Sequence, residues 1–230
     1  MKNLKKIFEK YKINVNFEQE EQFNKYFSLL IETNKVLNLT AITDEDEVLV
    51  KHFLDSVLPY NQFNKNSTVV DIGSGAGFPA LPLKIIRPDL DIYMVDSLNK
   101  RVNFLNNVIN SLKFDKIFAI HSRAEDFAKK NREKFDYAVA RAVAQLNTLV
   151  EYLLPLLKIG GKAIIYKSSK LEEEIKNAEK AIEILGGKIE KIEKYTLEDM
   201  ERNILIIKKI KNTPQKYPRD KNKPKLTPLI

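Results

Sequence analysis

The sequence has 230 residues, and its content of 43% hydrophobic and 30% charged residues is typical of a folded globular chain. It contains no cysteine, which excludes disulfides, thiolate metal sites and any mechanism that needs a thiol nucleophile. With His52 and His121 as its only imidazoles, we expect no metal site. The charged start lacks a signal-peptide core and no apolar run is long enough to span a membrane, so we expect a cytoplasmic protein without a membrane partner.

The formal net charge of +8 is distributed unevenly along the chain. Residues 1–66 hold nine basic and ten acidic side chains, whereas the last 19 residues hold five basic and one acidic. A basic body with a basic tail indicates a polyanionic partner, most simply a nucleic acid. The alternative is a lysine-rich surface that only faces water.

The first 66 residues predict a helical region. Phe23, Phe27 and Leu30 recur at helical spacing after an acidic start. A second helix is predicted from near Thr43 to Pro59, with four acidic residues in its first turn.

From residue 67 onward, short apolar runs alternate with amphipathic segments of helical length, such as Arg101–Leu112, Leu146–Leu157 and 171–185. This alternation predicts an α/β fold with a mostly parallel sheet and right-handed crossovers. The runs expected to form its parallel strands are Val69–Ile72, Ile92–Val95, Ile117–Ile120, Tyr137–Ala140 and Ala163–Tyr166.

The end of the chain predicts two further features. Segments 188–195 and 203–210 are joined by too few residues for a crossover helix, so we predict an antiparallel hairpin at the sheet edge. We therefore assign residues 67–211 to one α/β domain and residues 212–230 to a basic, proline-rich tail. Four of the nine prolines lie in that tail, which predicts an extended chain without a helix.

Three glycines, Gly73, Gly75 and Gly77, directly follow the predicted strand Val69–Ile72 and precede a predicted helix. Glycines at this position let the backbone turn sharply and approach a nucleotide-like ligand, although a tight turn without a ligand is the alternative. A dinucleotide site prefers glycine or alanine where this chain has Phe78, so the loop suits a ligand without a pyrophosphate.

Two aspartates accompany this loop. Asp96 ends the second predicted strand, 19 residues after Gly77, where an acidic residue accepts hydrogen bonds from ribose hydroxyls; the alternative is a helix cap. Asp71 lies at the end of the first strand, where it either faces a positive charge of the ligand or caps the loop.

The run VVDIGSGAGFPALPLKIIRPDLDIYMVDSLNKRVNFL resembles the cofactor half of class I S-adenosylmethionine methyltransferases. Together with NLTAI at 38–42, HFLDS at 52–56, SRAED at 122–126, ARA at 140–142 and YPR at 217–219, it resembles the bacterial 16S ribosomal RNA guanine-N7 methyltransferase G family, or glucose-inhibited division protein B. The resemblance implies a class I, Rossmann-like fold and S-adenosylmethionine as cofactor. It also implies methylation of a guanine N7 in the 530 loop of 16S ribosomal RNA, free or within the small-subunit particle.

Carried over residue by residue, the cofactor contacts of this family fall on Gly73, Phe78, Ala124, Glu125 and Arg141. The alternative for Glu125 is that its carboxylate only stabilises the start of a helix through the helix dipole. The alternative for Arg141 is a surface ion pair with Glu125 or Asp136.

Lys167 and Arg219 are the candidates for contact with RNA, with Asn38 and His52 as weaker ones; a lone His52 is also compatible with a buried structural role. We expect the tail to face the RNA through Tyr217 and Arg219, although a dispensable terminus is the alternative. In this tail Asn222, Leu226 and Thr227 stand where the family usually has glycine and lysine.

No catalytic residue is predicted. Guanine N7 already presents a lone pair and loses no proton, so alignment and proximity suffice for its attack on a sulfonium methyl. The segment AVARAV lacks the Asn/Asp-Pro-Pro-aromatic run of amine methyltransferases, which agrees with an N7 target. Two other classes stay open: an NAD-linked oxidoreductase on a Rossmann-like fold, and a non-enzymatic RNA-binding protein.

Overall fold

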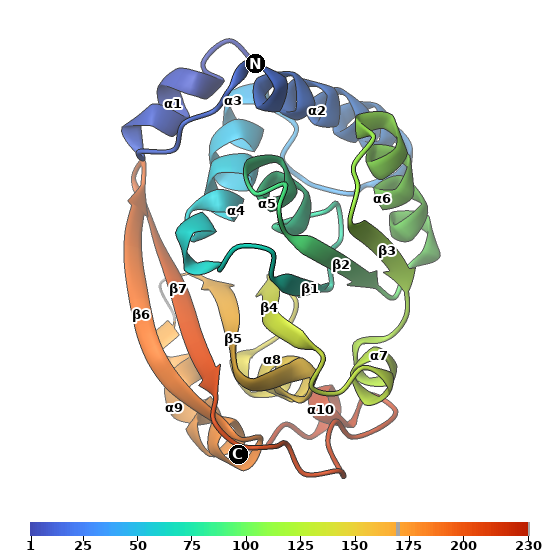
Figure 1. The fold of residues 1–230 in the computed structure, drawn as a ribbon, viewed down its shortest axis with the longest axis vertical. Coiled ribbons are helices and arrows are strands. Elements are labelled where there is room, and N and C mark those ends of the chain that lie inside the picture. The colour runs from blue at the N-terminus through green and yellow to red at the C-terminus, as the bar shows by residue number, and fades with distance from the viewer. Residues whose placement is uncertain (169–170, 230) are drawn as a thin grey trace.

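A seven-stranded sheet with the strand order β3–β2–β1–β4–β5–β7–β6 forms the centre of the computed structural model, which describes residues 1–168 and 171–229 (Figure 1). Strands β1 to β5 are parallel, whereas β7 runs antiparallel to both β5 and β6. The strands are β1 (Thr68–Ile72), β2 (Asp91–Asp96), β3 (Ile117–His121), β4 (Phe135–Arg141), β5 (Leu157–Lys167), β6 (Gly187–Leu197) and β7 (Met200–Lys209). The predicted mostly parallel sheet with an antiparallel edge hairpin is confirmed.

The strand order reverses at the middle of the sheet. From β1 the chain first adds β2 and β3 on one side and then crosses to β4 and β5 on the other. β1 pairs with β2 on one side and with β4 on the other, with Val69 opposite both Ile92 and Tyr137. Four of the five β1 residues are buried, as expected for a central parallel strand covered on both faces. Open α/β sheets bind ligands outside the carboxyl ends of the strands at such a reversal, and the glycine loop follows β1 there.

Helices cover both faces of the sheet (Figure 1). One face carries the N-terminal helices together with α5 and α6, and a single apolar cluster joins Leu4, Phe23 and Phe53 to the strand residues Ile92 and Ile164. The N-terminal region is therefore one packed layer of the same body. The helices and single turns before β2 are α1 (Leu4–Lys10), α2 (Phe17–Leu37), α3 (Glu45–Val48), η1 (Leu49–Leu54), α4 (Asp55–Val57), η2 (Tyr60–Gln62) and α5 (Ala80–Ile86).

The opposite face carries helices from the second half of the chain. Their apolar residues form another cluster with strand residues such as Val70 and Ile165. Besides α6 (Asn99–Leu112), which belongs to the first face, the remaining helices and turns are α7 (Ala124–Lys130), α8 (Leu146–Leu153), η3 (Leu154–Leu156), α9 (Leu171–Ile184) and α10 (Lys223–Leu226).

The helix α2 begins at a capping box, in which Asn16 and Gln19 exchange side-chain hydrogen bonds with each other's backbone amides. It ends at Asn38, whose φ of 48° is the left-handed conformation that asparagine tolerates at a helix C-terminus. Near its middle, the hydroxyl of Tyr26 donates to the Ala76 carbonyl at 2.5 Å. This bond fastens the glycine loop to the N-terminal layer.

The helix predicted between Thr43 and Pro59 is not one regular helix. Asp44 caps its start, accepting hydrogen bonds from the amides of Asp46 and Glu47, as the acidic first turn predicts. Residues 49–54 then form a π-helical turn, a rare distortion that no feature of the sequence predicts and that is frequent at functional sites.

The helix predicted over Leu146–Leu157 ends earlier, and β5 begins earlier than Ala163. Pro155 has no amide proton to continue the helix, so residues 154–156 form a 3₁₀ turn. Leu157 then pairs with Phe135 of β4.

The C-terminal tail is not the extended, helix-free segment that its prolines predict. It contains the one-turn helix α10, and Pro224 lies in its first turn, where no amide donor is needed. Figure 1 shows α10 beside α7 and α8. The tail is anchored by Arg219, whose backbone amide, Nε and Nη2 donate to the carboxylate of Glu151 on α8 at 2.7–3.2 Å. The Glu151 side chain is 0% exposed.

We predict that Arg219→Ala lowers the free energy of unfolding by about 3–5 kcal/mol, because it leaves the Glu151 carboxylate buried without a counter-ion. Lys223→Ala is the matched control, since it removes a tail cation that is exposed. It should change stability by no more than about 0.5 kcal/mol. Urea unfolding of the three proteins measures both effects, and equal stabilities for the two variants would contradict a structural role of Arg219.

Candidate functional site

Two cavities lie at the carboxyl ends of the parallel strands. The glycine-loop cavity, about 270 Å³, has Gly73, Asp96, Arg123, Glu125, Tyr152 and Lys225 in its lining. The basic cavity, about 460 Å³, has Lys51, His52, Asp55, Arg141, Lys167 and Arg202 in its lining. Ala142 belongs to both linings, so the two cavities meet just beyond the end of β4. Its φ of 57° is uncommon for alanine, and such strained backbone clusters at functional sites.

The three loop glycines are required for different reasons. All have positive φ, which other residues adopt at a cost. A Cβ at Gly73 would lie 2.7 Å from a methyl carbon of Val143, and one at Gly77 would lie 2.3 Å from Leu81, so both positions are packed against the protein. A Cβ at Gly75 would meet only the Gly73 carbonyl oxygen, at 3.9 Å, so Gly75 faces open space.

Asp96 both shapes the loop and lines the glycine-loop cavity. Its Oδ2 accepts a hydrogen bond from the Gly75 amide and its Oδ1 accepts one from the Leu98 amide, both at 2.9 Å. The side chain is 3% exposed, with Arg101 Nη1 at 3.5 Å from Oδ2. Asp96 thus bonds the glycine loop and the residue that precedes α6, which has no side-chain cap, and its contact with a ribose stays a prediction.

Asp71 is a buried carboxylate beneath the same loop. It is 0% exposed, and neither of its carboxylate oxygens has a hydrogen-bond partner among the described residues. Burial raises the pKa of Asp71 to about 8, against the influence of the Arg141 charge. Most of this group is therefore protonated and uncharged at pH 7, and it lies outside the linings of both cavities.

Glu125 lies at the start of α7, beyond the end of β3. The side chain is 3% exposed, and its Oε1 accepts hydrogen bonds from Arg123 Nε at 2.8 Å and from the Asn222 amide at 3.4 Å. Both bonds use Oε1, so Oε2 is left to the cavity in the part of the chain that the structure describes. The predicted alternative ion pair between Glu125 and Arg141 is absent among these residues, because Arg123 occupies that position.

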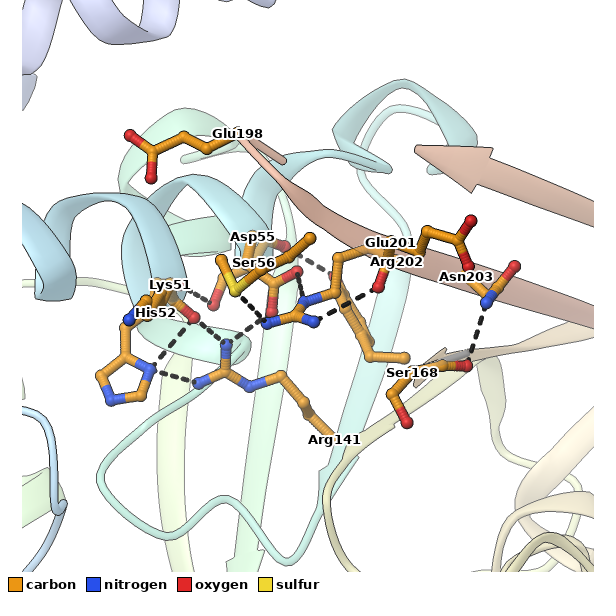
Figure 2. A network of polar contacts seen from close by, with 12 residues as sticks. Lys51, His52, Asp55, Ser56, Arg141, Ser168, Glu198, Glu201, Arg202 and Asn203 are labelled. Carbon is orange, nitrogen blue, oxygen red and sulfur yellow. Dashed lines mark hydrogen bonds and ion pairs between the residues drawn. The ribbon is translucent and has the colours of Figure 1, made fainter. Parts of the chain in front are cut away.

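Arg141 ends β4 and forms the centre of a polar network with the N-terminal layer (Figure 2). Its Nη1 donates to Asp55 Oδ2 at 2.9 Å and to the Lys51 carbonyl at 3.1 Å. Its Nη2 lies 3.3 Å from Nδ1 of His52, and its guanidinium lies 4.9 Å from the centre of the Phe78 ring. Arg141 thus lies in the wall of the basic cavity, while Phe78 is buried behind it.

His52 is neutral at pH 7. Burial, with Arg141 close by, lowers its pKa to about 4. Its Nε2 lies 2.8 Å from Thr40 Oγ1, and its ring is 4.5 Å from that of Phe78, centre to centre. His52 therefore faces the basic cavity as a polar, uncharged group and does not attract phosphate by charge.

The predicted site residues separate into three groups. Those that line the glycine-loop cavity are Gly73, Asp96, Ala124 and Glu125. Those that line the basic cavity are His52, Arg141 and Lys167. Those outside both linings are Asn38, Gly75, Gly77, Phe78 and Arg219. Arg219, expected to contact RNA, instead neutralises Glu151, and Lys167 pairs with Glu174 at 2.6 Å.

Several charged lining residues were not predicted, among them Asp55, Arg202 and Lys225. Asp55 lies in the quoted motif HFLDS, which could have indicated it. Arg202 reaches the basic cavity from β7, where its Nε lies 3.4 Å from Asp55 Oδ1 (Figure 2). Lys225 reaches the glycine-loop cavity from the tail. Neither cation has a local sequence signal, because long-range packing brings each of them to its cavity.

Within residues 1–168 and 171–229, no cluster of three acidic or histidine side chains is arranged to hold a metal ion. Among the same residues, no helix combines the length and apolar character needed to cross a membrane.

Comparison with known proteins adds relatives of high similarity. The family described as rRNA small subunit methyltransferase G matches residues 19–205. The Ribosomal RNA small subunit methyltransferase G of Lachnoclostridium phytofermentans is 51% identical over 224 residues, covering 95% of this chain and 93% of the relative. The protein of the same name from Lactobacillus johnsonii is 46% identical over 228 residues, covering 96% and 95%.

Solved structures share the fold at low sequence identity. A SAM-dependent methyltransferase from Aquifex aeolicus superimposes with a TM-score of 0.54 at 17% identity, covering 74% of this chain and 96% of that one. TYW2 of M. jannaschii, solved in complex with AdoMet, gives a TM-score of 0.53 at 16% identity, covering 68% and 77%. The predicted class I, Rossmann-like fold is confirmed.

We predict that Asp71→Asn flattens the pH dependence of stability between about pH 4 and pH 8. Because the folded pKa of Asp71 is raised from its usual 3.8 to about 8, the folded chain retains a proton that the unfolded chain releases. Wild-type stability should therefore fall as the pH rises through this window, and the variant should lack that contribution. Urea unfolding at pH 5 and pH 8 measures the free energy of unfolding of both proteins. An equal loss of stability in the wild type and in Asp71→Asn between these pH values would contradict the prediction.

Proposed function

Because this chain belongs to the rRNA small subunit methyltransferase G family, we propose that it transfers a methyl group from S-adenosylmethionine to N7 of a guanine in the 530 loop of 16S ribosomal RNA. The observation that supports this proposal most directly is the pair of cavities that meet at Ala142. A group-transfer enzyme needs a donor site and an acceptor site within bonding distance of each other. Since ribosomal RNA is the substrate, we place the enzyme in the cytoplasm.

The glycine-loop cavity is the proposed site of S-adenosylmethionine. Asp96 would accept hydrogen bonds from the ribose, and Glu125 with Ala124 would face the adenine edge. The open space at Gly75 leaves room for the methionine end of this molecule. When bound, S-adenosylmethionine supplies an electrophilic methyl carbon on a sulfonium.

The basic cavity is the proposed site of the target nucleotide. Its lining has four cationic side chains, of Lys51, Arg141, Lys167 and Arg202, against the two carboxylates of Asp55 and Glu174. An excess of positive charge attracts the phosphate backbone and positions the RNA without reading its sequence. The target guanine must be unpaired or splayed out to enter, because the deep major groove of A-form RNA excludes side chains.

Methylation at N7 suits the chemistry of these two cavities. The N7 lone pair attacks without loss of a proton, so no general base is required at the reacting atom. The histidine of the basic cavity, His52, is neutral at pH 7, and the cavity carboxylates Asp55 and Glu174 are occupied by Arg141 and Lys167. The proposed task of this chain is therefore to bind, orient and shield the reactants.

We predict that Asp96→Ala lowers both cofactor affinity and stability. Loss of ribose hydrogen bonds should weaken S-adenosylhomocysteine binding about fivefold to a hundredfold. Loss of the acceptor for the Gly75 and Leu98 amides should also lower the free energy of unfolding by about 1–3 kcal/mol. Calorimetric titration and urea unfolding measure the two effects, with the exposed Asp115→Ala as control. Unchanged affinity would contradict the ribose assignment.

Methyl transfer tests the proposed function directly. The protein is incubated with S-adenosylmethionine bearing a labelled methyl group and 16S RNA from a strain that lacks this modification, either free or in small-subunit particles. We expect the label on one guanine of the 530 loop, recovered as 7-methylguanosine by mass spectrometry of the nucleosides.

Each other outcome identifies a different error in the proposal. Label on another atom would contradict the N7 assignment, and label at another position would contradict the 530 loop. Binding of RNA and of S-adenosylhomocysteine without transfer would indicate a non-enzymatic RNA-binding protein. Binding of NADH in place of S-adenosylhomocysteine would indicate an oxidoreductase.

A further inference from the structure

The C-terminal segment, residues 213–229, is bound to the same helices that line the glycine-loop cavity. The Thr148 hydroxyl of α8 donates to the Pro224 carbonyl at 2.9 Å, and Thr148 is itself a lining residue. The Arg219 ion pair with Glu151 lies one helical turn further along α8. Tyr217 and Pro224 are buried. The segment is therefore an integral part of this face of the protein.

From these anchors the segment reaches the cavity itself. The Asn222 amide donates to Oε1 of Glu125 at 3.4 Å, and the Asn222 side chain accepts a hydrogen bond from Arg123. Lys225, three residues later, lines the cavity. Asn222 has a φ of 60°, a left-handed conformation that glycine and asparagine tolerate. The left-handed conformation at Asn222 thus turns the chain so that Asn222 contacts Glu125 and Arg123, and Lys225 reaches the cavity.

We propose that residues 219–225 form one wall of the cofactor site and hold Glu125 and Arg123 at the end of the cavity that takes the adenine base. This inference rests on the proposed function for the identity of the ligand. It replaces the expectation that the tail is an RNA-binding arm. The tail then acts on methylation through cofactor affinity, with Asn222 as a positioning residue and Lys225 as a residue that faces the ligand.

The charges of the segment agree with this assignment. Of its basic side chains, Arg219 forms an ion pair with Glu151, and Lys225 faces the glycine-loop cavity. Its only acid, Asp220, pairs with Lys129 of α7. These contacts hold the segment against α7 and α8. The described residues that line the basic cavity all lie between Ile42 and Arg202 in the sequence, so none of them belongs to the tail.

Hydrogen exchange on the wild-type, full-length protein tests the proposal without altering the fold. Ligand binding stabilises the folded state and slows exchange of amides that open in the free protein. Saturating S-adenosylhomocysteine should slow exchange at residues 219–226 about tenfold. Amides of the hairpin segment 187–197 that exchange by local opening should not change. Binding without any protection at 219–226 would overturn the proposal.

A pair of full-length variants gives a second readout. Asn222→Gly combined with Lys225→Ala keeps the left-handed backbone, the Arg219 anchor and the amide hydrogen bond to Glu125, but removes the Asn222 side chain that contacts Arg123 and the Lys225 side chain that lines the cavity. We expect its affinity for S-adenosylhomocysteine to fall about fivefold or more. The control Lys216→Ala removes an exposed tail cation outside the proposed wall and should bind within about twofold of the wild type.

The outcomes separate this inference from the proposed function. If the wild type does not bind S-adenosylhomocysteine, the proposed function fails first. If the double variant binds the ligand normally, and loses only affinity for a 16S RNA fragment as the Lys216→Ala control does, the tail is an RNA-binding arm and the inference is wrong. If the double variant loses affinity for the ligand and the control does not, the result supports the proposal that residues 219–225 form a wall of the cofactor site.

Discussion

The ion pair between Arg141 and Asp55 is the interaction on which the arrangement of the site depends. Arg141 ends β4, and Asp55 begins α4 in the N-terminal layer; their side chains are 14% and 8% exposed. A buried carboxylate without a counter-ion is costly, so the two elements are held together at this point. Asp55 also pairs with Arg202 of β7, and one carboxylate therefore connects the N-terminal layer, the centre of the sheet and its antiparallel hairpin (Figure 2).

The positions of the two cavities follow from this connection. The Arg141 side chain packs on Phe78, which immediately follows the glycine loop, and the loop is held from the other side by Asp96 and Tyr26. The chain beyond Arg141 then passes through Ala142, which belongs to both linings. The proposed donor and acceptor sites are thus adjacent because one strand end supports both, and the tail adds the outer wall of the donor site.

The sequence predicts the features that depend on residues close together in the chain. The parallel strands, the edge hairpin, the glycine loop and the position of Asp96 follow from local spacing and from the order of strands, whereas Glu125 was selected through the family resemblance. Arg202 and Lys225 could not be predicted, because pairing of β7 with β5 and docking of the tail bring them to the cavities. The ion pair of Arg219 with Glu151 could not be predicted for the same physical reason: nothing near Arg219 in the sequence reveals that Glu151 is buried and lacks another counter-ion in the described chain. The π-helical turn at 49–54 likewise reflects packing that no local pattern specifies.

The most direct test of the account is whether donor binding and acceptor binding are separable at the two cavities. Arg202→Gln removes one cation of the basic cavity and leaves the Arg141–Asp55 pair in place, so it should leave the Kd of S-adenosylhomocysteine within about twofold of the wild type while lowering kcat/KM for ribosomal RNA methylation by about tenfold or more. Lys194→Gln, an exposed cation on β6, is the charge-matched control and should leave both unchanged. Unaltered methylation by Arg202→Gln, or an equal loss of cofactor affinity and methylation, would contradict the assignment of the basic cavity to the RNA.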